Sequence, residues 1–213
     1  MIQALAQSIA FDEFIAWYPE NSETRYELHR GVIVEMPKPR GKHSDVAGFL
    51  SGSLFIEIGR MNLSYFIPRE CIVRTIDGES GYEPDVIVLD RQTIADDLQW
   101  EKESVITKGK STRLVIEVVS TNWRDDYAHK FTDYEALGIP EYWQVDYLGL
   151  GGRRYIGNPK QPTLSVCELI DGEYEIRQFR GSDPSGICEA ARIISPTLPD
   201  LQLTAEQVFA AGQ

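Results

Sequence analysis

Three ionisable residues carry the strongest chemical signal in this sequence. Asp85 stands at the start of an apolar run at residues 86–89, and Glu117 stands inside a second apolar run at residues 114–119. Lys130 follows on a segment whose apolar residues recur at helical spacing. A buried strand does not need a carboxylate, and burying one without a partner is costly. If the two runs form neighbouring strands, both carboxylates can converge on one point.

This arrangement predicts a site for a divalent metal ion. Two converging carboxylates repel each other, so one becomes protonated unless a cation lies between them. Hard oxygen ligands suit Mg²⁺ or Mn²⁺, and such an ion can polarise a phosphoryl oxygen. Lys130 can stabilise the charge that develops. Structural alternatives stay open, since Asp85 can cap a turn, Glu117 can form an ion pair with Lys130, and Lys130 can be a solvated helix residue.

Two further residues are candidates for the same site. Glu27 is the acidic residue of a short strand-like run, where it can be a third carboxylate or an exposed strand position. His43 opens a long amphipathic segment after a loop with Pro and Gly. It can contact phosphate or water at the mouth of the site, or serve as a surface or capping histidine. For His29 and His129 the sequence identifies no partner.

The composition is typical of a soluble globular protein, and we expect a single domain over residues 1–213. The net charge of −12 disfavours nonspecific adhesion to nucleic acid, which relies on Lys and Arg. It is compatible with a site where metal ions supply the positive charge. The chain has no apolar run of membrane-spanning length, no basic signal region and no metal-ligand spacing of its 3 cysteines. Reduced cysteines and a cytoplasmic location are therefore expected.

The periodicity predicts one α+β domain with a mixed β-sheet flanked by helices. Helices are expected at residues 11–18, 43–60, from Asn122 or Asp125 to Gly138, and 204–211. Strands are expected at residues 26–28, 31–36, 65–67, 71–76, 85–89, 113–119 and 141–147. Alternating runs at residues 153–156, 163–170, 174–179 and 187–194 predict a C-terminal β-meander. The polar residues 92–110 predict a loop with one helical turn.

Taken together, these residues resemble a known family, the Uma-type endonucleases, long known only as a domain of unknown function. That family belongs to the PD-(D/E)XK, restriction-endonuclease-like superfamily. The resemblance spans roughly residues 11–209. It is carried by an ordered set of motifs: Tyr26-Glu27-Leu28, Gly31, Met36-Pro37, His43, Pro84-Asp85, residues 114–120, Lys130, Tyr134, Gly138-Ile139 and residues 141–146.

The resemblance implies a restriction-endonuclease-like fold in which Asp85 and Glu117 hold Mg²⁺ or Mn²⁺. It implies that Glu27 is an additional metal ligand or a base that holds a water. It also implies that Lys130 stabilises the pentacovalent phosphate, that His43 assists at the edge, and that the substrate is DNA.

Two positions depart from the expected pattern. The superfamily's lysine two residues after the glutamate is absent, because Val119 stands there. Lys130 instead matches the lysine that the family carries on the following helix. Arg30 replaces an acidic residue found in many members.

The sequence leaves three functions open. The first is a metal-dependent endonuclease that hydrolyses phosphodiester bonds in DNA. The alternative is a noncatalytic nucleic-acid-binding or assembly module that retains the nuclease fold, and a third is a hydrolase of another phosphodiester. Apolar faces of the expected meander suggest a subunit interface, and nucleases of this superfamily are often dimers, so we expect a homodimer.

Overall fold

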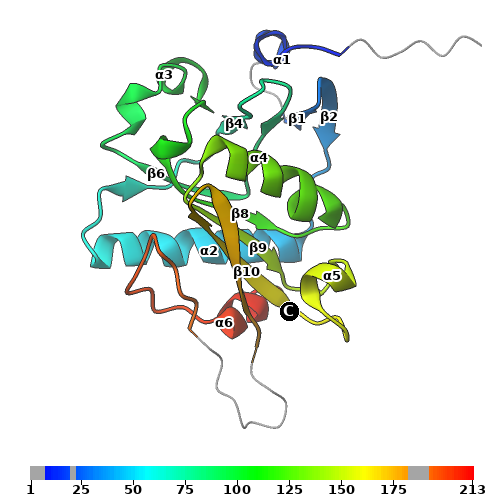
Figure 1. The fold of residues 1–213 in the computed structure, drawn as a ribbon, viewed down its shortest axis with the longest axis vertical. Helices are drawn as coiled ribbons and strands as arrows, with labels where there is room; N and C mark the ends of the chain where they lie inside the picture. Colours follow the sequence, from blue (N-terminus) through cyan, green and yellow to red (C-terminus); the bar gives the residue numbers. More distant parts are fainter. Residues whose placement is uncertain (1–7, 20–22, 182–191) are drawn as a thin grey trace, which may run out of the picture.

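The protein is described here from a computed structural model, which covers residues 8–19, 23–181 and 192–213 (Figure 1). Cys188 and most of the strand expected at residues 187–194 lie outside these residues. Within them, Arg192 forms an isolated antiparallel β-bridge with Thr204. None of the helices in the described ranges is long and apolar enough to cross a membrane.

Two mixed sheets form in place of the single sheet expected. In the described residues the first sheet has five strands in the order β2-β1-β5-β4-β7, and the second has six in the order β11-β10-β9-β8-β6-β3. The strands of the first sheet are β1 (Arg25–His29), β2 (Val32–Met36), β4 (Ile72–Arg74), β5 (Gly81–Tyr82) and β7 (Val105–Ile106). Those of the second are β3 (Tyr65–Phe66), β6 (Val86–Asp90), β8 (Thr112–Val118), β9 (Glu141–Asp146), β10 (Thr163–Ile170) and β11 (Glu173–Phe179).

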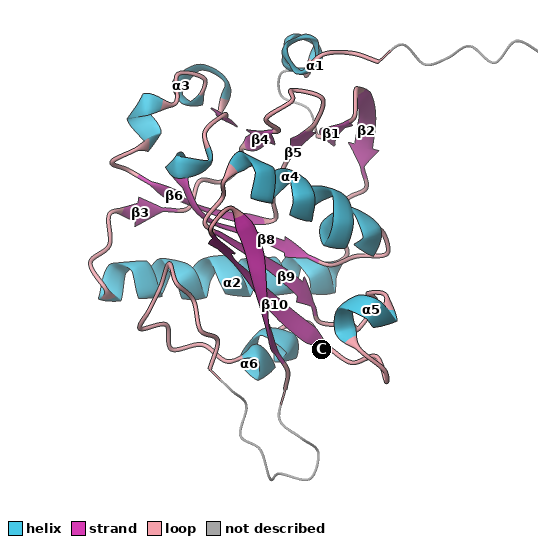
Figure 2. Ribbon diagram, in the orientation of Figure 1, coloured by secondary structure: helices cyan, strands magenta, loops and turns pink. Residues whose placement is uncertain are grey.

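Helices cover both faces of the second sheet (Figure 2). The α-helices are α1 (Phe11–Trp17), α2 (Gly41–Arg60), α3 (Trp100–Glu103), α4 (Lys130–Leu137), α5 (Arg153–Ile156) and α6 (Ala205–Ala210). A π-helical turn, Asp125–His129, leads directly into α4. Short 3-10 turns occupy Ile94–Asp96 and Gly109–Ser111.

Alternation along β8 divides the core into two layers. Leu114 and Ile116 pack on the side of α2 and α6, whereas Val115 packs on the opposite side with Tyr134 of α4. Because successive side chains of a strand point to opposite faces, Glu117 lies on the α4 side, like Val115. The β-branched run therefore forms a central strand that is buried on both faces, as its composition indicates.

Most elements expected from the sequence are confirmed, including the β1–β2 hairpin and the antiparallel β9-β10-β11 meander. The expectation for residues 153–156 is wrong, because this stretch is helix α5 rather than a strand. Gly152 enters the helix with extended backbone, and Ile156 packs with Val119 and Tyr127. The expected loop at residues 92–110 also contains α3 and β7, which pairs in parallel with β4.

Candidate active site

Neighbouring strands bring Asp85 and Glu117 together. Strands β6 and β8 are antiparallel, with Val86 opposite Ile116. One step further along this register, Asp85 lies opposite Glu117, and opposed side chains share one face of the sheet. The expectation that their two strands are neighbours is confirmed.

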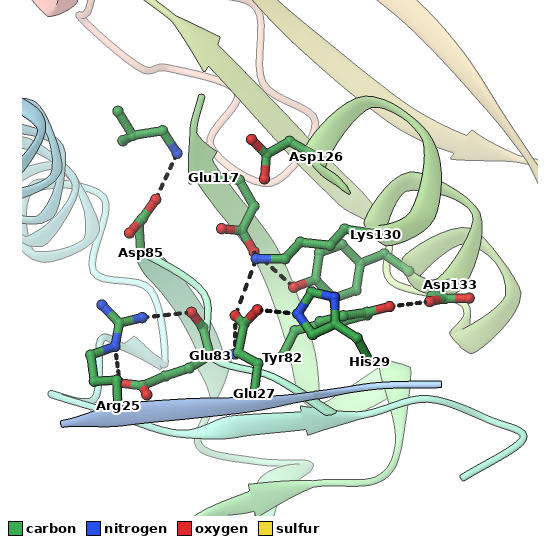
Figure 3. A network of polar contacts seen from close by, with 12 residues as sticks. Arg25, Glu27, His29, Tyr82, Glu83, Asp85, Glu117, Asp126, Lys130 and Asp133 are labelled. Carbon is green, nitrogen blue, oxygen red and sulfur yellow. Dashed lines mark hydrogen bonds and ion pairs between the residues drawn. The ribbon is translucent and has the colours of Figure 1, made fainter. Parts of the chain in front are cut away.

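Lys130 reaches this point from the first turn of α4. Its side chain is buried, and its Nζ lies 3.0 Å from Glu117 Oε1 and 3.2 Å from Glu27 Oε1 (Figure 3). Nζ also lies 5.4 Å from the centre of the Tyr82 ring. Burial lowers the pKa of Lys130, but the nearby carboxylates outweigh burial and raise it well above its ordinary value. The ammonium group therefore stays charged inside the protein.

Glu27 is buried on β1, not exposed. The Glu83 main-chain N–H and Lys130 donate to its Oε1 at 3.0 and 3.2 Å, and His29 Nε2 donates to its Oε2 at 2.7 Å. Burial raises the pKa of Glu27, but Lys130 and His29 outweigh burial and lower it to about 2. Both oxygens of this carboxylate thus have partners. The sequence analysis missed His29 as that partner, although residues two apart on a strand share a face.

Asp85 and His43 meet at the main chain of Val118. The Val118 N–H donates to Asp85 Oδ2 at 2.8 Å, and His43 Nε2 donates to the Val118 carbonyl at 3.0 Å. His43 Nε2 also lies 3.3 Å from Asp85 Oδ2. Burial lowers the pKa of His43, but the Asp85 carboxylate outweighs burial and raises it. Residue 43 therefore lies beside the site and holds Asp85 in place.

Glu117 is held less completely than Glu27. Tyr134 donates its hydroxyl to Glu117 Oε1 at 2.9 Å, and Lys130 contacts the same oxygen. Burial raises the pKa of Glu117 to about 7, Lys130 partly offsets this, and Asp85 and Glu27 raise it further. Lys130 alone therefore does not balance the negative charge at this point.

Asp126 is a further carboxylate of the site, and the sequence analysis missed it. It lies in the π-helical turn before α4 and is 7% exposed. Burial raises its pKa well above the ordinary value, and Lys130 partly offsets this. The signal available in the sequence was weak, because Asp126 stands beside Arg124 and Asp125 and reads as part of a solvated helix start.

The donor set fits a hard divalent cation in charge and chemistry. Asp85 and Glu117 supply oxygen ligands, and the carboxylates Glu27 and Asp126 add negative charge around the single ammonium of Lys130. In the described ranges, however, no group of 3 or more His, Cys, Asp or Glu side chains stands ready to surround an ion. The site as it stands thus offers two facing ligands and an excess of negative charge.

A wide cleft lies beside the site. It has a volume of about 1620 Å³ and is lined by the β1–β2 region, by residues 36–39 and by Trp100. Arg25 and Glu83, which form an ion pair at 3.0 Å, both line it. Because the Glu83 main chain bonds to Glu27, the wall of the cleft connects directly to the buried carboxylates.

Comparison with known proteins agrees with this geometry. The fold is similar to the crystal structure of a putative nuclease belonging to DUF820 from Anabaena variabilis, with a TM-score of 0.70 and 19% sequence identity, over 96% of this chain and 99% of that chain. No curated protein matches the chain significantly. The model of the Uma2 family, described as "Putative restriction endonuclease", matches residues 11–206. The chain, with its restriction-endonuclease-like fold, therefore belongs to the Uma2 family.

Proposed function

We propose that this protein is a Mg²⁺- or Mn²⁺-dependent endonuclease that hydrolyses phosphodiester bonds in DNA. One observation carries the proposal: Asp85 and Glu117 face each other on neighbouring strands, with the Lys130 ammonium 3.0 Å from Glu117 in a buried site. Membership of a family described as restriction endonucleases supports the same activity.

Asp85 and Glu117 are the proposed metal ligands. When bound, the ion supplies Lewis-acid polarisation of a phosphoryl oxygen and a lower pKa for a coordinated water. His43 and the Val118 main chain orient Asp85 for this contact. Two carboxylates that face each other across a strand pair can both stay ionised when a divalent ion lies between them.

We assign Glu27 a positioning role rather than the metal-ligand role that the resemblance implies. Its oxygens are already bonded to Lys130, His29 and the Glu83 main chain. Glu27 therefore holds the Lys130 ammonium where it can contact a phosphate oxygen. A fixed positive charge of this kind stabilises the charge that develops during phosphodiester cleavage.

Cleavage of supercoiled, linear, single-stranded and branched DNA in Mn²⁺ tests the proposal. We expect cleavage that EDTA abolishes, and a loss of about 100-fold or more in Asp85→Ala. Asp125→Asn is the matched control, because Asp125 contacts His129 and lies outside the proposed ligand set. Cleavage in EDTA, or full activity of Asp85→Ala, would contradict the proposal.

The same assay separates the other two functions. The net charge of −12 favours the noncatalytic binding or assembly module, since it provides no broad basic surface. Binding of DNA without cleavage at any Mn²⁺ concentration would support that module. Hydrolysis of nucleotide diesters but not of DNA would indicate another phosphodiester as substrate.

A cytoplasmic homodimer remains part of the proposal. Strand β11 is outermost in its sheet among the described strands, and its Ile176 is 53% exposed. In an antiparallel two-fold pairing of β11 centred on Ile176, Glu175 of one copy lies opposite Arg177 of the other. Sedimentation equilibrium tests this: the wild type should be a dimer, and Arg177→Glu should shift it toward monomer.

A further inference from the structure

The carboxylate of Asp126 has no bonding partner in the structure. Its main-chain carbonyl is fixed, because the Tyr142 hydroxyl and Gln144 Nε2 each donate to it at 2.9 Å. Among the described residues, however, no group donates a hydrogen bond to the Asp126 side chain, although the residue is more than nine-tenths buried. A buried carboxylate without a donor is unfavourable for the fold alone.

The direction of this side chain points to a ligand. Figure 3 shows the Asp126 carboxyl group directed toward Glu117, on the far side of Glu117 from Glu27. The charges that act on Asp126 are those of the site itself, with Lys130 first and then Glu117, Asp85 and Glu27. Lys130 is already bonded to Glu27 and Glu117. A further cation is therefore the partner that the charge on Asp126 lacks.

We propose that Asp126 is a third carboxylate of the cation site, beside Asp85 and Glu117. This inference rests on the proposed function, because it concerns the same ion. In the described ranges no three such side chains already surround a common point, so Asp126 acts through a water of the ion. Mg²⁺ usually keeps several of its waters in protein sites, and a carboxylate that accepts hydrogen bonds from them increases affinity.

Titration with Mn²⁺ by calorimetry, together with melting temperatures in EDTA, tests the inference without an activity assay. We expect Asp126→Asn to weaken Mn²⁺ binding at least tenfold, as loss of an outer carboxylate commonly does. In EDTA we expect its melting temperature to equal or exceed that of the wild type, because the substitution removes an unpaired buried charge. Asp126→Ala serves as a second variant, with the same expected loss of affinity.

Asp125→Asn is the matched control, since it removes the same charge one residue away, where Asp125 contacts His129. Its Mn²⁺ affinity should equal that of the wild type. Equal affinity in wild type, Asp126→Asn and Asp126→Ala would overturn the role of Asp126 and leave the metal site at Asp85 and Glu117 standing. Absence of Mn²⁺ binding in the wild type would overturn both the inference and the metal-dependent function.

Discussion

Glu117 and Glu141 are both buried carboxylates on central strands, but different groups hold them. Glu141 accepts hydrogen bonds from Trp143 Nε1 at 2.6 Å, from the Ser195 hydroxyl at 2.9 Å and from the Thr197 N–H at 2.9 Å. These donors are neutral, and two of them belong to the C-terminal segment. Glu117 instead shares one ammonium with Glu27 and faces Asp85 and Asp126.

Asp146, at the end of β9, resembles Glu141. It is buried and accepts main-chain hydrogen bonds from Leu150 at 2.8 Å and Gly151 at 2.7 Å. Carboxylates that neutral donors surround shape a loop or tie down a segment, and they need no ion. The difference teaches that the kind of partner, rather than burial, separates a structural acid from a candidate catalytic one.

Lys130→Met should give the largest effect, because it removes the cation from between two buried carboxylates. We expect a loss of about 3–5 kcal/mol in the free energy of unfolding, measured by urea denaturation in EDTA. The control is Lys110→Met, which breaks the exposed Lys110–Asp96 ion pair and should cost less than about 1 kcal/mol. A similar small cost for both variants would mean that the buried cluster behaves like a surface ion pair.

The pH dependence of stability should separate Glu117→Gln from the wild type. Because the folded-state pKa of Glu117 is raised from 4.5 to about 7, its protonated form stabilises the fold fully below pH 4.5. That contribution is lost as the pH rises through about 7, at a cost of at most about 3 kcal/mol. Urea denaturation in EDTA at pH 5 and pH 8 should therefore show a steeper decline for the wild type.

The charged groups that face Glu117 also contribute to this profile. They are Lys130 of α4, Glu27 of β1, Asp85 before β6 and Asp126 of the π-helical turn. The comparison between wild type and Glu117→Gln largely removes contributions that do not depend on Glu117. Parallel pH profiles for the two proteins would show that Glu117 is not strained by its neighbours.

Glu141→Gln should give the smallest effect and should leave metal binding unchanged. The amide of Gln meets donors that need an acceptor, so we expect a loss of about 1–2 kcal/mol in stability. Calorimetry with Mn²⁺ should give the same affinity as for the wild type. A weaker affinity would erase the distinction between the two groups of buried acids.

The sequence was sufficient to predict the centre of the site. Asp85 and Glu117 were visible because each is a single acid in or beside an apolar strand, and strand neighbourhood followed from length and composition. The burial of Glu27 could not be decided in this way. It depends on β1 lying between β2 and β5 and on Lys130, which is 103 residues away in the chain.

Asp126 and residues 153–156 were mispredicted or missed for local reasons. A π-helical turn changes the angular spacing of side chains, so α-helical periodicity does not indicate which residue faces inward. Residues 153–156 alternate like a strand, but the buried Ile156 and the entry at Gly152 favour a helical turn. In both places, packing against distant residues decided the structure.

The Lys130 ammonium bonds at once to Glu27 of the first sheet and to Glu117 of the second. This three-way contact joins the N-terminal hairpin to the central layer of the molecule. Separating the two sheets would expose one charge of each pair to a nonpolar surface, so the sheets should lose protection from hydrogen exchange together. The same ammonium that is proposed to act on phosphate would then also make unfolding a single cooperative event.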